Sequence, residues 1–288
     1  MVLNIMNICK KYGDKVVLKD FSLELTNGVY GLLGANGAGK TTLMKIIVDI
    51  LKANSGKILI DGVDKNSLGD GYRALIGYLP QELGIYKDFN AYDFLMYMAA
   101  LKGIDGKVAK EMVYNLLEIT NLKEDAKTKC GKFSGGMKRR LGIAQSLIND
   151  PKILILDEPT VGLDPKERIH FRNMISNISR ERIVLLSTHI VSDIEFIANK
   201  VIILKNGELV ENETVENLVE SIKNKVWITR VKAEEIKELE AKYVVSNMTQ
   251  KENYIELRII SDSIPFDGCE LVNANFEEVY LYYFNYKE

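Results

Sequence analysis

The sequence predicts an α/β protein that is interrupted by a helical insertion and followed by a small α+β appendage. Three observations support this fold class. Strand-like apolar runs alternate with helical stretches over residues 1–80 and again over residues 150–204. Residues 84–149 are rich in leucine, methionine and alanine at helical spacing. A smaller alternation of strands and helices begins after Glu213.

The N-terminal region is expected to form several strands and one helix. Apolar residues at every second position predict strands at 5–8, 16–18 and 21–25. The apolar run 29–33 ends at glycines and predicts a buried strand. Helical spacing covers 40–51, and Asn54-Ser55-Gly56 then ends the helix. Two further strands are expected at 57–60 and 75–79.

The helical insertion and the second half of the α/β core follow. The spacing of apolar residues predicts helices at 92–102, 107–119 and 134–148 within the insertion. Short runs of branched apolar residues then predict buried parallel strands at 153–156, 183–187 and 201–204. Helices are expected between these strands, at 165–179 and 191–198.

The C-terminal segment predicts a separate small domain. Strands are expected at 226–231, 254–259 and 270–272, and helices at 233–243 and 276–286. We therefore divide the chain into residues 1–215, with a helical subdomain at about 84–149, and residues 216–288.

Composition excludes several classes of protein. The chain has 288 residues, 47% of them hydrophobic, and a formal net charge of -2, which argues against a free-standing nucleic-acid binder. Its three cysteines have no paired spacing and predict reduced thiols in the cytosol. The N-terminus does not resemble a signal peptide. The longest apolar run, 94–101, is far shorter than the ~20 residues that cross a bilayer.

A glycine-rich loop lies between the strand at 29–33 and the next helix. Residues 34–41, Gly-Ala-Asn-Gly-Ala-Gly-Lys-Thr, match G-x-x-x-x-G-K-[ST] completely. Such a loop turns its N–H groups toward a phosphate, and the helix adds its positive end. We expect Lys40 to reach the β- and γ-phosphates of ATP and Thr41 to bind Mg²⁺. The expected nucleotide contacts are Gly34, Asn36, Gly37, Ala38, Gly39, Lys40, Thr41 and Thr42.

Two adjacent acids end the strand at 153–156. Asp157 and Glu158 therefore lie at the carboxyl edge of the predicted sheet, where open α/β sheets bind their ligands. We expect Asp157 to hold Mg²⁺ through water and Glu158 to act as the general base toward the attacking water. Taken alone, the two acids could equally be a solvated strand end. The presence of the phosphate loop in the same chain favours the metal and base roles.

Further motifs make the chain resemble the ATPase cassettes of ABC transporters. Phe133-Ser134-Gly135-Gly136-Met137 is similar to the family's signature, Gln81 to its Q-loop, Gly162-Leu163-Asp164 to its D-loop, and His189 to its switch histidine. Tyr12 lies where the family has an adenine-stacking aromatic. The motifs occur in the family's order over about residues 1–215. The resemblance implies a P-loop NTPase (RecA-like) core with an inserted helical subdomain.

The resemblance also implies that each ATP site is shared between two cassettes. Ser134, Gly135 and Gly136 would bind the γ-phosphate held by the other subunit's phosphate loop, and Asp164 would support the interface. His189 would contact the γ-phosphate and hold the attacking water. Gln81 would touch Mg²⁺ and sense the membrane partner. For Tyr12 and His189, plain structural roles are the alternatives.

The sequence departs from the family pattern at two signature positions. Phe133 replaces a leucine, which is a mild apolar change. Met137 replaces a glutamine and removes an amide that could donate and accept hydrogen bonds. Every catalytic position that aligns is filled, so we expect an active ATPase.

The resemblance implies a subunit that powers transport by a separate membrane permease, with export of a drug, antibiotic or lipid-like compound as the leading expectation. The partners would be ATP, Mg²⁺, the permease and a second cassette, most simply a copy of this chain, at the cytoplasmic face of the membrane. No nucleic-acid partner is expected. The alternatives are a soluble ABC ATPase acting on ribosomes or DNA and an inactive regulatory cassette.

Overall fold

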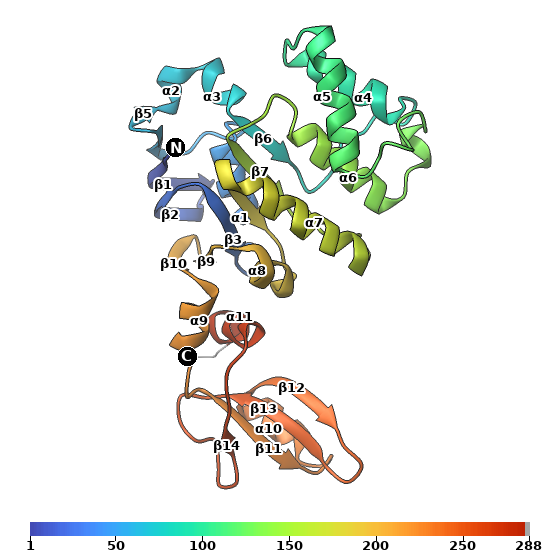
Figure 1. Cartoon of the computed structure of the whole chain (residues 1–288). Helices are drawn as coiled ribbons and strands as arrows, with labels where there is room; N and C mark the ends of the chain where they lie inside the picture. Colours follow the sequence, from blue (N-terminus) through green and yellow to red (C-terminus); the bar gives the residue numbers. More distant parts are fainter. Residues whose placement is uncertain (286–288) are drawn as a thin grey trace. The chain divides into compact units, whose positions relative to one another are not determined.

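The central element of the fold is a six-stranded sheet (Figure 1). The computed structural model describes residues 1–285. The strand order is β10 (Glu208–Glu213), β9 (Lys200–Lys205), β3 (Gly28–Leu33), β8 (Ile183–Ser187), β7 (Ile153–Asp157) and β6 (Ile76–Leu79). The five strands from β9 to β6 pair in parallel. Every residue of β7 and β8 is buried, as their unbroken apolar sequences predict.

A second, antiparallel sheet comes from the N-terminal region. Its order is β2 (Lys15–Leu25), β1 (Leu3–Tyr12), β4 (Ser55–Ile60) and β5 (Val63–Asp64). Alternate residues of β1 and β2, such as Leu3 and Phe21, are buried in one apolar cluster with Leu43 of α1 (Lys40–Ile47) and Leu185 of β8. The two sheets therefore share a core through α1, which fixes the loop that precedes this helix.

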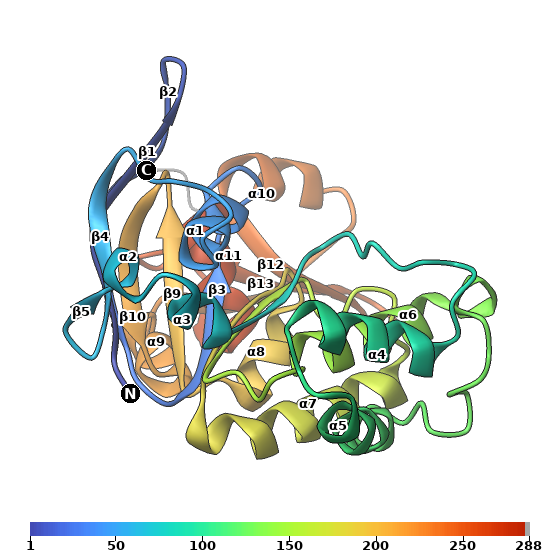
Figure 2. The same cartoon turned by 90° about the horizontal axis from the view of Figure 1, so that it is seen from above.

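The insertion between β6 and β7 is helical, as predicted. It contains α4 (Ala91–Leu101), α5 (Gly106–Ile119), the short turn η1 (Cys130–Lys132) and α6 (Gly135–Ser146), which gather together in both views (Figures 1 and 2). The Asn90 side chain caps α4 by accepting a hydrogen bond from the N–H of Asp93. Phe94 and Leu95 are fully buried in the α4 face that supports the subdomain.

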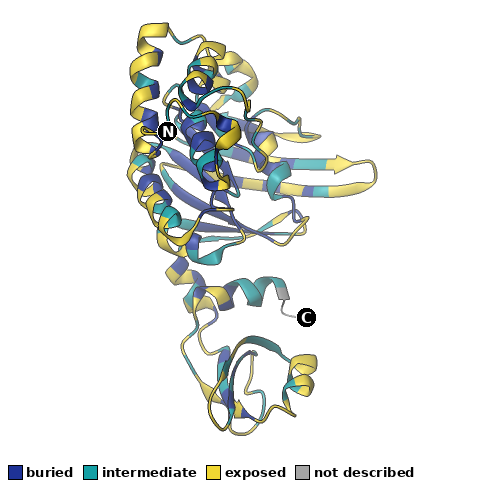
Figure 3. Cartoon of the chain, turned by 90° about the vertical axis from the view of Figure 1, so that its right-hand side faces the viewer, coloured by how far each residue is buried: buried dark blue, intermediate teal, exposed yellow. Residues whose placement is uncertain are grey.

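Two further helices follow β7 along the chain. Asp164 caps α7 (Pro165–Ile178), and the turn η2 (Ser179–Glu181) leads into β8. The helix α8 (Val191–Ile197) precedes β9. Figure 3 shows the buried residues concentrated on the strands of the central sheet. Within residues 1–285, no helix has both the length and the apolar character needed to cross a bilayer.

The chain divides into two compact units, one of residues 1–189 and 196–212 and the other of residues 190–195 and Glu213 onward. The second unit contains an antiparallel sheet of order β12 (Val244–Gln250), β13 (Ile255–Ile260), β11 (Val226–Val231) and β14 (Glu270–Leu271). Its helical segments are most of α8, α9 (Val215–Ser221), α10 (Ile236–Lys242) and α11 (Phe276–Asn285). The predicted α+β character of this segment is confirmed; Tyr286, the expected last helical residue, lies outside the described residues.

The structure corrects several element boundaries. The helix after the phosphate loop ends at Ile47 rather than Leu51, because Asp49 adopts a left-handed φ of 62° and the N–H of Ile50 bonds back to the Lys45 carbonyl. Tyr72 and Lys65 donate to the carbonyls of Ile47 and Ile46 at this end. Elements that the sequence pattern missed are short or lie half-exposed, so their apolar spacing is weak. They are β5, α2 (Lys65–Leu68), α3 (Asp70–Ala74), β10, α9 and β12.

Candidate functional site

The phosphate loop lies between β3 and α1 and forms one wall of a cavity of about 310 Å³. Two of its glycines are required by close backbone contacts. A Cβ on Gly34 would lie 2.7 Å from the Leu204 carbonyl oxygen, and one on Gly39, whose φ is 110°, would lie 2.9 Å from that of Val17. The residues lining the cavity are Lys15, Val17, Asn36, Gly37, Gly39, Lys40, Thr41, Thr42, Gln81, Asp157 and Glu158. Six of the eight phosphate-loop residues that were expected to contact nucleotide thus line this cavity, and Gly34 and Ala38 do not.

Lys40 supplies the positive charge of this cavity. Its ammonium donates hydrogen bonds to the carbonyls of Gly34 at 2.6 Å and Ala35 at 3.2 Å. Burial lowers the pKa of Lys40, and the negative charges of Glu158 and Asp157 oppose that shift. A cation in this position, beside the N-terminus of α1, favours an anionic ligand.

Asp157 lies at the end of β7 and is held by two hydroxyl groups. The Thr41 hydroxyl donates to Oδ2 at 3.1 Å, and the Ser187 hydroxyl donates to Oδ1 at 2.5 Å. Ser187 was not predicted as a site residue. It could have been predicted from the pairing of the two strands, because the parallel register of β7 and β8 makes Asp157 and Ser187 direct partners at the strand ends.

Hard oxygen donors in this cavity fit Mg²⁺. They are the hydroxyl of Thr41, the carboxylate of Asp157 and the side-chain carbonyl of Gln81. No group of three or more His, Cys, Asp or Glu side chains in residues 1–285 could hold a metal alone. Few protein ligands are typical of Mg²⁺ sites that are completed by water and nucleotide phosphates.

Glu158 contacts His189 directly. The His189 Nδ1 lies 2.8 Å from Glu158 Oε2, and the His189 main-chain N–H donates to the same oxygen at 3.4 Å. An ionised carboxylate only accepts hydrogen bonds, so the shared proton belongs to Nδ1 of His189. The Glu158 side chain is 12% exposed and that of His189 is 67% exposed. The pair therefore combines a shielded carboxylate with an accessible imidazole.

The predicted signature and D-loop residues do not line this cavity. Ser134 caps α6 by accepting from the N–H of Met137 at 3.1 Å, and Asp164 caps α7 by accepting from the N–H of Glu167 at 2.8 Å. Gly136 packs so closely on α7 that a Cβ there would lie 2.3 Å from a Glu167 carboxylate oxygen. Signature and D-loop thus lie together, apart from the chain's own phosphate loop.

Tyr12, the expected adenine contact, ends β1 and is 50% exposed. It does not line the cavity, whereas its cross-strand partner Lys15 does. The Lys10 ammonium lies 5.2 Å from the centre of the Tyr12 ring, so this exposed face already accommodates a cation. Lys15 and Val17 of β2 were missed because neither belongs to a motif.

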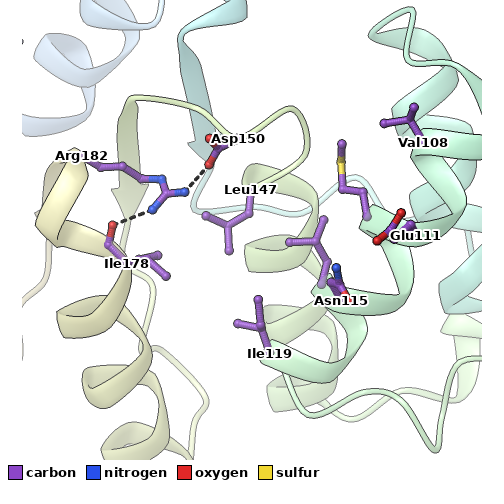
Figure 4. Close-up of a pocket in the computed structure, with 10 residues that line it drawn as sticks. Val108, Glu111, Asn115, Ile119, Leu147, Asp150, Ile178 and Arg182 are labelled. Atoms are coloured by element: carbon purple, nitrogen blue, oxygen red, sulfur yellow. Dashed lines mark hydrogen bonds and ion pairs between the residues drawn. The ribbon is translucent and has the colours of Figure 1, made fainter.

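A second cavity, of about 360 Å³, lies between α5 and the end of α7 (Figure 4). Its wall is largely apolar and includes Ile119 and Leu147, and an ion pair between Asp150 and Arg182 forms one edge. None of the phosphate-loop or carboxylate residues lines it. The cavity at the phosphate loop is therefore the candidate nucleotide site.

The comparisons with known proteins agree with this geometry. A family model described as "ABC transporter" matches residues 18–161, half of the chain. The "Uncharacterized ABC transporter ATP-binding protein YxlF" of Bacillus subtilis is 37% identical over 251 residues, which cover 87% of this chain and 83% of that protein. These similarities extend beyond the phosphate loop to the whole cassette.

Two further relatives and a solved structure are similar over about three quarters of the chain. The Nod factor export ATP-binding protein I of Burkholderia orbicola is 35% identical, over 76% of this chain and 73% of that protein. The linearmycin resistance ATP-binding protein LnrL of Bacillus subtilis is 35% identical, over 75% and 70%.

The solved structure is that of the ATP-binding cassette MJ0796, a dimer in a post-hydrolysis state bound to ADP and Pi. It superposes with a TM-score of 0.67 at 25% identity, over 74% of this chain and 98% of that one. The predicted fold class and ATPase activity are thereby confirmed. The chain belongs to the ABC transporter family and is an ATP-binding subunit that hydrolyses ATP for transport.

Proposed function

We propose that this subunit powers export through a separate membrane permease, by ATP-driven pairing of two cassettes. The observation that carries the proposal is the separation within one chain of the nucleotide cavity from Ser134 and Asp164. A single chain offers the phosphate loop and the carboxylates, and a second cassette would add its signature. The dimeric state of MJ0796 and the names of the Nod factor and linearmycin relatives support this reading.

The described residues suggest how the reaction is arranged. The loop N–H groups and Lys40 would hold the phosphates. Thr41, Asp157 and Gln81 would hold Mg²⁺, which when bound supplies positive charge against the phosphates. Glu158 would accept a proton from the attacking water at its carboxylate, while His189 keeps that carboxylate oriented through the 2.8 Å contact. Positioning and charge neutralisation account for the chemistry.

Functionally, residues 1–215 would form the cassette and residues 216–288 a small appended domain.

The cassette also offers a surface for the permease. A cavity of about 370 Å³ lies between the end of α1 and the helical insertion, and Ile50 and Leu101 at its edge are 63% and 65% exposed. Tyr78 in its wall lies on β6, three residues before Gln81. Exposed apolar side chains around a hollow fit an apolar helix of a membrane protein.

Replacing Glu158 by Gln tests the catalytic part of the proposal. The amide keeps the shape of the side chain and loses its basicity, so ATP should bind and be hydrolysed very slowly. With ATP and Mg²⁺ the variant should accumulate as a dimer in light scattering. Glu82→Gln, next to Gln81 but outside the cavity, is the matched control. A Glu158→Gln chain that stays monomeric at saturating ATP would contradict pairing of identical cassettes.

Replacing Leu101 by Glu tests the docking surface. The charge should lower the fraction of the chain that sediments with membranes of the cells that naturally produce it. ATP hydrolysis by the purified chain should not change, because Leu101 lies outside the nucleotide cavity. Val108→Glu, on the exposed face of α5 beside the other apolar cavity, is the control. If Val108→Glu instead lowers the fraction that sediments with membranes, the docking surface lies at the cavity beside α5.

A further inference from the structure

Arg139 lies in α6, two residues after Met137, and is only 5% exposed. Its guanidinium donates five hydrogen bonds, all to main-chain carbonyls. Nε donates to Pro159 at 3.1 Å, and Nη1 donates to Pro80 and Gln81, each at 3.1 Å. Nη2 donates to Asp157 and Glu158. All five N–H groups of the guanidinium are thus used.

These carbonyls belong to the two loops that hold the proposed catalytic side chains. Three successive carbonyl oxygens, of residues 157–159, converge on one guanidinium, although their dipoles repel one another. Glu158 has a φ of 52°, in the left-handed region that a residue with a side chain rarely adopts. A buried cation that donates hydrogen bonds to all three carbonyls stabilises this turn and therefore the direction of the Glu158 side chain.

Two nearby carboxylates oppose the cost of burying the Arg139 charge. Burial lowers its pKa, and the charges of Asp157 and Glu158 oppose that shift. Its hydrogen bonds nevertheless go to the carbonyls of these residues and leave their carboxylates to face the nucleotide cavity. The guanidinium thus stabilises the backbone of the acids without competing for the oxygens that chemistry requires.

The neighbouring residue Arg140 provides a contrast on the same helix. Its guanidinium donates to the carbonyls of Thr120 and Asn121 and pairs with Glu167 at 3.3 Å. None of these partners lines the nucleotide cavity. Arg140 therefore ties α6 to other helices, whereas Arg139 ties it to the catalytic loops.

We propose that Arg139 is a positioning residue that sets Glu158 and the Gln81 loop relative to the signature helix. Ser134 caps the N-terminus of the helix that carries Arg139. The end of α6 that would meet the other cassette's nucleotide is thereby bonded to the catalytic turn of its own cassette. This inference rests on the roles proposed above for Glu158 and Ser134.

Arg139→Ala is the first test, with Arg140→Ala as the matched control. ATP affinity should stay close to that of the wild type, because the phosphate loop is untouched. The kcat should fall about a hundredfold, as expected when a reacting group is displaced by about 1 Å. Arg140→Ala should retain most activity. Free guanidinium at millimolar concentration should partly restore hydrolysis to Arg139→Ala and not to other inactive variants.

Arg139→Lys keeps the charge and the stem but cannot reach carbonyls in a planar fork. It should therefore be nearly as slow as Arg139→Ala. It also serves as the test variant if thermal melting shows that Arg139→Ala does not fold. An Arg139→Lys chain with wild-type kcat would overturn the inference, since charge alone would then suffice.

A double-mutant cycle decides whether Arg139 acts through Glu158. In a Glu158→Gln background, removing Arg139 should slow the residual hydrolysis by much less than in the wild type. Equal factors in both backgrounds would overturn the inference and leave the role of Glu158 intact. Wild-type hydrolysis by Glu158→Gln alone would instead overturn the proposed base, and the inference with it.

Discussion

Two glycine-containing helix N-termini of this chain, at α1 and at α6, differ in how their free N–H groups are used. The helix α1 follows Gly39, which adopts φ 110° and has no side chain to cap the helix. The helix α6 is capped by its own Ser134, which accepts from the Met137 N–H. The uncapped end opens into a cavity with Lys40, whereas Ser134 and Gly135 at the capped end are exposed and do not line that cavity.

The difference indicates which part of an ATP site one chain can build alone. The phosphate loop brings glycines, a cation and the hydroxyl proposed to bind Mg²⁺ together over eight consecutive residues, and the carboxylates line the same cavity. The signature segment has only a helix end and open space beside Gly135, where a Cβ would contact nothing. It can contribute to a site once another surface is placed against it.

The largest effect is expected from Lys40→Ala, which removes the cation of the first helix end. ATP hydrolysis should be abolished, and ATP affinity should fall by roughly 10- to 100-fold, the usual value of a hydrogen bond to a charged group. Calorimetric titration beside a thermal melt measures both affinity and folding. Lys45→Ala, exposed on the same helix, is the control. Normal affinity and hydrolysis in a folded Lys40→Ala chain would refute the phosphate-loop assignment.

The second prediction uses the two helix ends together. Lys40→Ala and Ser134→Arg should each be nearly inactive, the first for lack of a phosphate grip and the second because arginine adds bulk at the signature. A mixed dimer should contain one intact site, since each chain supplies what the other lacks. Steady-state hydrolysis should therefore recover in part when one variant is titrated into the other at fixed total protein.

The recovery should stay below half of the wild-type rate, because only one of two sites is repaired. Differential tags establish that mixed dimers form. A flat titration despite confirmed mixed dimers would count against sharing of the site. If the wild-type chain does not self-associate with ATP, a second, different cassette takes the partner's place in the same experiment.

An intermediate effect is expected from Ser187→Ala, which removes a hydrogen bond to Asp157 in the cavity at the N-terminus of α1. Ser187 is fully buried and its hydroxyl donates to Asp157 Oδ1 at 2.5 Å. Loss of this donor should raise the Mg²⁺ concentration that gives half-maximal hydrolysis by about tenfold. Ser187→Thr retains a hydroxyl and should be milder. If Ser187→Ala needs no more Mg²⁺ than the wild type, the proposal that Asp157 holds the metal would be contradicted.

The smallest effect is expected from Met137→Gln, at the second helix end. The hydrogen bond to Ser134 uses the backbone N–H of residue 137, which the substitution keeps. Hydrolysis should therefore change only modestly. A loss beyond about a hundredfold, or roughly 2.7 kcal/mol of barrier, would reveal a specific role of the methionine side chain.

The accuracy of the predictions follows the burial of each element. Buried apolar runs correctly predicted the five parallel strands of the central sheet, and helical spacing predicted the three inserted helices. The elements β5, α2 and α3 were missed because they are largely exposed and contain no apolar run. The predicted end of α1 was wrong because the chain leaves the helical conformation at Asp49, whose φ of 62° is not visible in the apolar pattern.

The candidate site shows the same limit. Contiguous motifs predicted Lys40, Thr41, Asp157 and Glu158, and the structure brings them to one cavity. The predicted stacking by Tyr12 depended on position alone, and Tyr12 does not line that cavity. Ser187 escaped notice as a site residue because its partner Asp157 lies thirty residues away and is opposite only through the register of β7 and β8.

By itself, the sequence determined the α/β class, the helical insertion and the phosphate loop. Each of these depends on residues close together along the chain, whose spacing and chemistry can be compared directly. Only the tertiary structure decided that Arg139 would bind the carbonyls of Pro80, Gln81 and residues 157–159. Every residue has a main-chain carbonyl, so the residue types do not show which carbonyl a given donor will bind. Only folding determines which donor reaches which carbonyl.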